Sequence, residues 1–293
     1  MCIKAIIVTF NPTDNIFNLV NSLKKQNVYS IVVDNGSENF DFRDIENDHD
    51  TTLIKLHENY GIAKAQNEGV KKAVEMSAEF LFFFDQDSII DDSFVDDMIH
   101  DYEILISKYD NVGALGPRFV DQRQGFYYKA ITISENGKRI KLDVEKLENP
   151  IHSKLLISSG SLVSQKVFLN TGFMREDYFI DYVDTEWCIR AESKGYKNFI
   201  SSKGKMVHSI GDNIKNFGFL TIPIHSPFRR YHIIRNNFYM FKESYIPKKF
   251  VTHQLIVNCI HQFFLILTMG KMSKQYFIVF LKAIKDGVKY LLR

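Results

Sequence analysis

The sequence contains few cysteines, and their arrangement excludes two common ways of stabilising a small domain. Among 293 residues there are three, Cys2, Cys188 and Cys259, an odd number at wide spacings. Such spacing forms neither a disulfide framework nor the paired cysteines of a structural zinc site. A reducing compartment is therefore the environment that we expect for this protein.

The sequence also lacks the features of a secreted chain. Residues 1–12 contain neither a basic n-region nor a cleavable apolar stretch. No signal peptide is therefore predicted, and a cytoplasmic location is expected. Internal repeats and low-complexity tracts are missing as well. The length of 293 residues fits one large domain or one domain with an appendage.

Acidic residues are nearly absent from the C-terminal part, which divides the chain by charge. Residues 226–293 contain twelve Lys or Arg but only two acids, Glu243 and Asp286, a net charge of +10. Because the whole chain carries +2, residues 1–225 carry −8. We therefore expect two domains, 1–225 and 226–293, that meet different partners.

The basic C-terminal region is predicted to form amphipathic helices. Residues 251–270 are mostly apolar, but His253, Gln254, Asn258, His261 and Gln262 interrupt them, whereas spanning a bilayer takes about 20 mostly apolar residues. The last segment places Lys282, Lys285, Lys289 and Arg293 on one helical face, opposite apolar residues. This pattern favours helices that lie in a membrane surface. A helical cap on the first domain or a contact between two copies would explain the same pattern.

Predicted strands and helices alternate along the first part of the chain. The strands are predicted at 3–10, 30–33, 52–56, 80–84 and 112–117, with helices near 16–23, 60–76 and 91–107. A hairpin insert is expected within 118–155, and 155–163 resumes strand character with small residues at its centre. The alternation predicts βαβ units and a mostly parallel sheet flanked by helices.

Polar residues follow the first four predicted strands. They are Asn11, Asp34, Asn59 and Asp85. In parallel sheets, ligands bind outside the carboxyl ends of the strands. The sequence therefore predicts a ligand site at this edge of the sheet.

Two acids end the fourth predicted strand in the segment Phe84-Asp85-Gln86-Asp87-Ser88. Side chains at i and i+2 of an extended backbone point the same way, so both carboxylates can converge on one point. Hard oxygen donors suit Mg²⁺ or Mn²⁺, especially a cation that carries phosphates. An ordinary turn after a strand is the alternative interpretation. His208, after a later short strand, is either structural or a third metal ligand.

A second group of acids, Asp181, Asp184 and Glu186, lies just before the only tryptophan, Trp187. If Asp184 begins a helix, it can act as an N-cap. Glu186 can form an exposed ion pair with Arg190, four residues later. Three carboxylates within six residues exceed what a helix cap needs, which indicates a catalytic carboxylate.

Taken in order, these motifs resemble glycosyltransferase family 2, the inverting enzymes of GT-A fold, and within it bacterial rhamnosyltransferases. The resemblance covers about 1–245 and rests on the following segments: Ile6-Ile7-Val8-Thr9-Phe10-Asn11, Val32-Val33-Asp34-Asn35-Gly36-Ser37, Asn59-Tyr60-Gly61-Ile62-Ala63, Asn67-Glu68-Gly69, Phe84-Asp85-Gln86-Asp87-Ser88, Asp181 to Arg190, His208-Ser209-Ile210-Gly211, and Arg230-Tyr231 to Arg235-Asn236. It implies a GT-A fold with a C-terminal helical extension and a divalent metal cofactor.

The resemblance also implies a role for each matching position. Thr9 and Asn11 would line the nucleotide pocket, and Asp34 would bind the base. Asn59, Gly61 and Asn67 would lie near the ribose and diphosphate. Asp85 would face ribose or metal, and Asp87 and His208 would bind the metal.

The general base and the acceptor region are also implied. The base would be Asp184, with Asp181 and Glu186 as alternatives, because relatives often carry two adjacent acids where this chain has Val183-Asp184. Trp187, Arg230 and Arg235 are assigned to the acceptor region. The implied activity is transfer of a sugar, expected to be L-rhamnose from dTDP-L-rhamnose, to a lipid-linked saccharide in surface-polysaccharide synthesis. UDP-galactose and UDP-glucose are the alternative donors.

Two other functions fit the sequence less well. A nucleotidyltransferase usually needs a Gly-rich, basic loop after the first strand, and Asn11-Pro12-Thr13-Asp14 offers neither. The Arg- and aromatic-rich stretch 229–241 can stack nucleic-acid bases. However, the acidic first domain would repel phosphate backbones, so no nucleic-acid partner is expected.

Overall fold

The computed structural model of the chain describes residues 1–122, 124–208, 214–217 and 220–293. The chain forms two compact units. The sheet unit comprises 1–133, 140–179 and 183–208. The helical unit comprises 134–139, 180–182 and 209–293. This division differs from a single boundary at residue 225, because two short segments from the middle of the chain join the C-terminal part.

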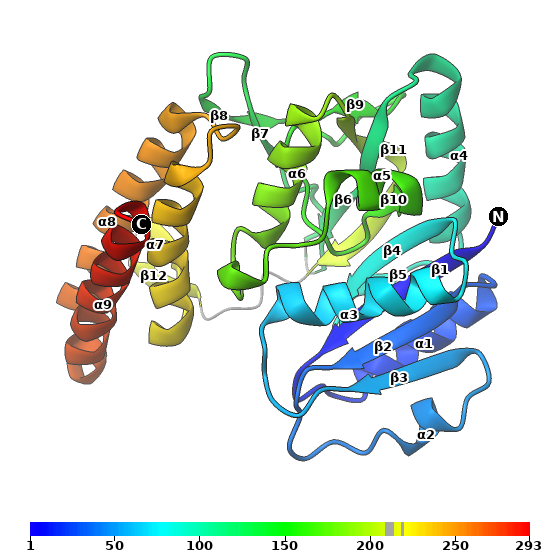
Figure 1. Cartoon of the computed structure of the whole chain (residues 1–293), viewed down its shortest axis with the longest axis horizontal. Helices are drawn as coiled ribbons and strands as arrows, with labels where there is room; N and C mark the ends of the chain where they lie inside the picture. The colour runs from blue at the N-terminus through cyan, green and yellow to red at the C-terminus, as the bar shows by residue number, and fades with distance from the viewer. Residues whose placement is uncertain (123, 209–213, 218–219) are drawn as a thin grey trace. The chain divides into compact units, whose positions relative to one another are not determined.

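The sheet unit is built on a mixed sheet, for which nine strands are described (Figure 1). Its order is β3-β2-β1-β4-β10-β6-β11-β5, and β9 pairs with β11. The strands are β1 (Ile3–Thr9), β2 (Tyr29–Asp34), β3 (Thr51–Lys55), β4 (Phe80–Asp85), β5 (Ile89–Ile90), β6 (Val112–Asp121), β9 (Ile151–His152), β10 (Leu162–Ser164) and β11 (Lys197–His208). The first four strands are parallel, and β10 runs antiparallel to both β4 and β6.

Helices cover both faces of this sheet (Figure 1). They are α1 (Asn15–Lys25), α2 (Arg43–Glu46), α3 (Ile62–Glu75), α4 (Phe94–Lys108), α5 (Gln165–Thr171) and α6 (Val183–Ser193), with a 3₁₀ turn η1 (Glu176–Tyr178). Side chains alternate between the faces. Ile7 and Phe84 pack in a core with α1 and α4, whereas Phe83 contacts Phe168 of α5 at 5.6 Å between ring centroids. These two buried layers fix the register of the strands.

The register aligns the polar residues that follow the strands. Thr9 pairs with Asp34, and Val8 pairs with Asp85. The structure confirms the predicted strands and helices of 1–117. It also confirms the predicted hairpin, which is formed by β7 (Ala130–Ile133) and β8 (Arg139–Leu142). The sheet and its flanking helices give the predicted fold class.

One predicted strand is wrong over most of its length. Of residues 155–163, only Leu162 and Val163 belong to a strand. The preceding residues turn instead, since Gly160 has φ +76° and the Ser161 N–H donates to the Ser158 carbonyl at 2.9 Å. A left-handed glycine is incompatible with a regular strand.

The described residues of the helical unit form three long helices (Figure 1). They are α7 (Pro227–Lys242), α8 (Lys248–Thr268) and α9 (Ser273–Leu291), with a 3₁₀ turn η2 (Gly270–Met272) and the hairpin β12 (Ile214–Phe217) and β13 (Leu220–Pro223). Gly287 allows α9 to approach α7 closely, because a Cβ there would lie 2.4 Å from the Phe238 ring. Buried Ile234, Phe280 and Ala283 form part of the core.

Helix α8 has a polar side and an apolar side. By length and composition alone it could cross a membrane. Its polar side is packed inside the unit, where Gln262 accepts from Arg230 Nε at 2.8 Å and donates to the Tyr276 carbonyl at 2.7 Å. Large apolar side chains lie on the solvent side of α8 and continue onto α9. We define this apolar face by Ile256, Ile260, Phe263 and Leu267 of α8 and Phe277, Leu281 and Val288 of α9, each 40% exposed or more.

Candidate active site

The ends of β1 and β2 are joined by hydrogen bonds around Asp34. This carboxylate is buried, and it accepts from the Ser37 N–H at 3.2 Å and from Thr9 Oγ1 at 3.4 Å. Ser37 Oγ also donates to Asp34 at 2.5 Å and accepts from the Asn11 N–H at 2.7 Å. Three predicted nucleotide-binding residues, Thr9, Asn11 and Asp34, therefore lie together, and Ser37 connects them.

The segment before α3 is held against the loop that follows β2. Asn35 Nδ2 donates to Asn59 Oδ1 at 2.9 Å, and the same oxygen accepts from the Gly61 N–H at 3.0 Å. Gly61 has φ +88°, and a Cβ there would lie 2.5 Å from the Phe179 carbonyl. Asn59 and Gly61 thus lie at the predicted edge of the sheet, where glycine is required by the backbone.

Asn67 has a different environment. Its side chain is buried, its amide donates to the Met174 carbonyl at 2.9 Å, and its Oδ1 accepts from the Met174 N–H at 2.9 Å. A second donated bond goes to Glu176 Oε1 at 3.0 Å. These bonds anchor the loop before η1, so Asn67 acts on the position of that loop.

The Asp85-Gln86-Asp87 turn lies at the end of β4. Asp85 is the last residue of the strand, half-buried, whereas Asp87 is exposed. Gln86 bridges this turn to the end of β1: its Oε1 accepts from the Phe10 N–H at 2.7 Å, and its Nε2 donates to the Phe10 carbonyl at 3.3 Å. Sequence reasoning missed this role, because only the partner at the end of β1 reveals it.

The pairing of β5 and β11 bears on His208. Val207 pairs with Ile89, two residues after Asp87, so the His208 backbone is placed close to this turn. The His208 side chain lies outside the described residues. Among the side chains that are described, no three His, Cys, Asp or Glu residues form a metal-binding group. Two carboxylates at a sheet edge remain a suitable set of hard donors for Mg²⁺ or Mn²⁺.

The candidate base, Asp184, lies in the first turn of α6. The helix begins at Val183, so Asp184 lies inside its first turn and the condition for an N-cap role is not met. One carboxylate oxygen, Oδ2, accepts from the Ser158 N–H at 3.4 Å, and Oδ1 accepts from the Thr185 N–H at 2.7 Å. The Ser158 contact links the base to the turn that contains Gly160.

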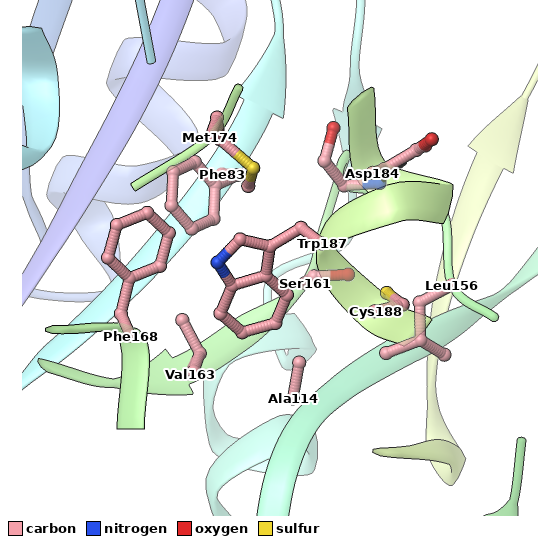
Figure 2. A pocket seen from close by; sticks show the side chains of 11 residues that line it. Phe83, Ala114, Leu156, Ser161, Val163, Phe168, Met174, Asp184, Trp187 and Cys188 are labelled. Atoms are coloured by element: carbon pink, nitrogen blue, oxygen red, sulfur yellow. Dashed lines mark hydrogen bonds between the residues drawn. The ribbon is translucent and has the colours of Figure 1, made fainter. Parts of the chain in front are cut away.

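A small pocket, partly open to solvent, borders Asp184 (Figure 2). Apolar side chains from β4, β10, α5 and α6 line most of it, including Phe83, Phe168 and Trp187. Ser158, Ser161 and Asp184 also line it, but only their apolar atoms face the space. The pocket itself is therefore apolar, and the Asp184 carboxylate accepts from the polar turn at Ser158.

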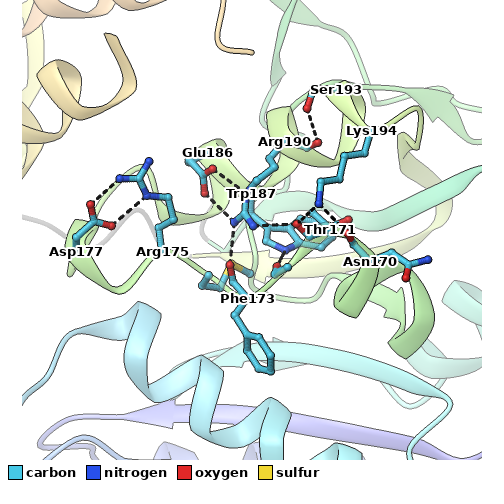
Figure 3. Close-up of polar contacts among 12 residues, drawn as sticks. Asn170, Thr171, Phe173, Arg175, Asp177, Glu186, Trp187, Arg190, Ser193 and Lys194 are labelled. Carbon is cyan, nitrogen blue, oxygen red and sulfur yellow. Dashed lines mark hydrogen bonds and ion pairs between the residues drawn. The ribbon is translucent and has the colours of Figure 1, made fainter. Parts of the chain in front are cut away.

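Glu186 is not exposed as predicted. Its side chain is 0% exposed, and both oxygens accept from Arg190, at 2.8 Å from Nε and 3.0 Å from Nη2 (Figure 3). Arg190 also donates to the carbonyls of Thr171 and Phe173. The predicted ion pair is therefore present but buried, and it joins α6 to the end of α5.

Trp187 belongs to the core of the sheet unit. The indole is 3% exposed, stacks on Phe168 at 5.3 Å, and donates from Nε1 to the Gly172 carbonyl at 2.9 Å. This burial favours a packing role over the predicted contact with an acceptor.

The remaining candidates lie in the helical unit. Asp181 forms an ion pair with Arg229, at 3.2 Å from Nη2, yet burial raises the pKa of this carboxyl group. Arg230 is buried, and desolvation lowers its pKa to about 10. Arg235 lies over the rings of Tyr231 and Tyr239, at 5.4 and 4.8 Å. Arg230 donates to Gln262 and to the Asn258 carbonyl inside the unit, whereas Arg235 is half-buried beside aromatic rings.

Comparisons with known proteins place this site in context. Residues 4–169 match the profile of Glycosyl transferase family 2. The chain is 40% identical over 294 residues to "dTDP-rhamnosyl transferase RfbF" of Shigella flexneri, covering 98% of this chain and 95% of the relative.

Two solved structures share the fold. One is S. aureus TarS 1–349 in complex with UDP-GlcNAc, with a TM-score of 0.59 and 16% identity over 99% of this chain and 84% of that chain. The other is GalNAc-T7 with UDP, GalNAc and Mn²⁺, with a TM-score of 0.57 and 13% identity over 71% of this chain and 44% of that chain.

Proposed function

Because the chain belongs to glycosyltransferase family 2 and uses a nucleotide-sugar donor, we propose that it is an inverting rhamnosyltransferase that uses dTDP-L-rhamnose. The observation that carries the choice of sugar is the similarity to the Shigella dTDP-rhamnosyl transferase, which extends over nearly the whole chain. UDP-galactose or UDP-glucose is the alternative donor.

The proposed nucleotide site is the edge formed by β1, β2 and β4. Asp34 binds the base, and Thr9 and Asn11 lie beside it. Hydrogen bonds through Ser37 hold these residues together. Asn59, Gly61 and Asp85 lie toward the ribose and diphosphate. Asn67 supports this region indirectly through the loop before η1.

The proposed metal ligands are Asp85, Asp87 and His208. When bound, a divalent cation neutralises the charge that grows on the departing nucleoside diphosphate. The Gln86 bridge to Phe10 keeps the turn that carries both acids against the nucleotide edge.

Asp184 is the proposed general base. Inversion requires the acceptor hydroxyl to attack the anomeric carbon from the side opposite the leaving group, and a carboxylate removes its proton. Both Glu186 oxygens accept from Arg190, and Asp181 is paired with Arg229. Asp184 accepts from the N–H groups of Ser158 and Thr185 and from the Thr185 hydroxyl, and its position at the start of α6 matches the base position implied by the family resemblance.

The proposed acceptor is a lipid-linked saccharide, and the enzyme is proposed to be peripheral at the inner face of the cytoplasmic membrane. Two features support this location. The apolar face of α8 and α9 can enter the membrane surface, and the exposed Lys274, Lys285 and Lys289 are suited to anionic lipid. Since the polar side of α8 is packed inside the helical unit, insertion into the membrane surface fits better than a span. Arg235 is proposed to face the acceptor.

A screen of donors tests this proposal. Purified protein is incubated with dTDP-L-rhamnose, UDP-galactose and UDP-glucose, and release of nucleoside diphosphate is measured with and without a chelator. We expect turnover of dTDP-L-rhamnose alone, lost with chelator and restored by excess Mg²⁺. Preferred turnover of either UDP-sugar would contradict the donor assignment, and chelator-insensitive turnover would contradict the metal.

A further inference from the structure

The turn Ser158–Ser161 is fixed to the centre of the sheet. The Gly160 N–H donates to the Phe83 carbonyl at 2.6 Å, and the Phe83 N–H donates to the Ser161 carbonyl at 3.1 Å. Gly160 is in the left-handed region, and a Cβ there would lie 2.5 Å from Met206 Sδ and 2.6 Å from Pro117 Cγ. The turn therefore has little freedom to move relative to β4.

One residue of this turn, Ser159, holds both ends of the metal-side acid turn. Its side chain is 3% exposed. Ser159 Oγ accepts from the Asp85 N–H at 3.2 Å and lies 2.8 Å from Ser88 Oγ. Asp87 lies between these two contacts, so Ser159 fixes the backbone on either side of it.

The preceding residue, Ser158, contacts the candidate base. Its N–H donates to Asp184 Oδ2, while its own hydroxyl accepts from Gln66 Nε2 of α3 at 3.2 Å. Gln66 is 3% exposed, an unusual location for a glutamine. The buried Gln66 amide therefore helps to position Ser158, and Ser158 in turn donates to the carboxylate of Asp184.

We propose that the Ser158–Ser161 turn is a positioning element that sets the separation of the metal-side acids from the base, with Ser159 holding Asp85 and Gln66 holding Ser158 against Asp184. This inference rests on the proposed function. Asp85 and Asp184 lie 99 residues apart in the sequence, and the adjacent residues Ser159 and Ser158 of one turn contact them.

The geometry of inversion explains why such an element matters. The leaving diphosphate and the attacking hydroxyl lie on opposite sides of the anomeric carbon, so the distance between their protein partners must be maintained. A misplacement of about 1 Å can reduce a rate roughly 100-fold. The two halves of the turn should therefore affect different kinetic quantities: Ser159 the affinity for the metal-bound nucleotide, and Gln66 the rate of transfer.

Three variants of the full-length protein test this inference. Ser159→Ala removes the acceptor of the Asp85 N–H, and Gln66→Met removes the amide while retaining side-chain length. Ser153→Ala is the matched control, since Ser153 is also fully buried in the sheet unit and its hydroxyl donates to a carbonyl two residues later, at 2.7 Å, without contacting either acid. The affinity for dTDP in the presence of Mg²⁺ is measured by calorimetry, and kcat by rhamnosyl transfer.

Ser159→Ala is expected to weaken dTDP affinity about 3–10-fold, the range for one lost hydrogen bond. Gln66→Met is expected to lower kcat about tenfold while dTDP affinity changes less than about twofold. Ser153→Ala should change neither quantity beyond about twofold. The inference is overturned if Ser159→Ala and Gln66→Met match the control, or if all three variants lower both quantities alike.

Failure of the proposed function would look different. If the wild-type protein turns over a UDP-sugar in place of dTDP-L-rhamnose, the donor assignment is wrong, and the Ser159 half is then tested by the affinity for UDP with Mg²⁺. If Asp184→Asn retains full transfer, the base assignment fails, whichever result the serine variants give.

Discussion

At the scale of single residues, the two acids at the start of α6 have different environments although they lie two positions apart. Asp184 accepts from backbone N–H groups and borders a pocket, whereas Glu186 is buried against Arg190. The sequence alone does not separate them, because the burial of Glu186 depends on α5 and the segment 171–173. The same limitation applies to Trp187, whose partner Phe168 is also distant in sequence.

The buried pair of Glu186 and Arg190 makes a prediction about stability. Arg190→Met would leave the Glu186 carboxylate buried without its ion-pair partner, which typically costs about 3–5 kcal/mol. We expect a loss of this order in the free energy of unfolding, measured by urea titration. Arg43→Met is the control: Arg43 pairs with Asp41, but both side chains are mostly exposed, so the free energy of unfolding should stay close to that of the wild type. Equal effects of the two variants would contradict this interpretation.

At the scale of elements, the sequence patterns predict strands and helices well where apolar residues alternate or recur regularly. The prediction fails at 155–161 because Leu155-Leu156-Ile157 has the composition of a buried strand. The actual structure of this segment depends on Gly160, which turns the chain beneath Met206 and Pro117. The connecting roles of Gln86, Ser159 and Gln66 do not follow from the sequence either, since each depends on a partner more than 70 residues away.

The loop that follows β2 gives a second prediction, at Gly36. This residue has φ +83°, and a Cβ there would lie 2.5 Å from the Glu58 carbonyl carbon. Gly36→Ala should therefore destabilise the protein by more than the roughly 1 kcal/mol expected from φ alone, and should weaken dTDP binding. Gly195→Ala separates the two causes, because Gly195 has φ +89° but a Cβ there would meet no atom of the described residues within 4 Å. Thermal unfolding and calorimetry measure both effects. A Gly36→Ala protein no less stable than Gly195→Ala would argue against the clash.

The apolar face of α8 and α9 gives a third prediction, on membrane association. Ile260 and Leu267 are 65% and 82% exposed, so replacing both with Gln should disturb the fold little. We expect the double variant to lose most of its sedimentation with vesicles that contain anionic lipid. Ile106→Gln, at a 52% exposed position in the sheet unit, is the control and should sediment like the wild type. Unchanged sedimentation of the double variant would refute the membrane assignment.

At the scale of the whole molecule, the order of motifs predicts the family and the fold. The family match and the 40% identical relative confirm the family, and the fold is shared with S. aureus TarS. Motif order carries this information because each polar segment follows a strand whose place in the sheet is fixed by topology. The acceptor does not follow from such an argument, since neither its binding residues nor its chemistry is set by the nucleotide edge.

Asp184→Asn removes the carboxylate of the proposed base while keeping the shape of the side chain. Rhamnosyl transfer from dTDP-L-rhamnose to a membrane extract that contains the acceptor is measured for the wild type and for Asp184→Asn, alongside dTDP affinity. We predict that the variant loses at least about 100-fold in transfer rate, the scale of a lost general base, while its dTDP affinity changes less than about twofold. Near-wild-type transfer by Asp184→Asn would contradict the account, as would its loss of dTDP binding.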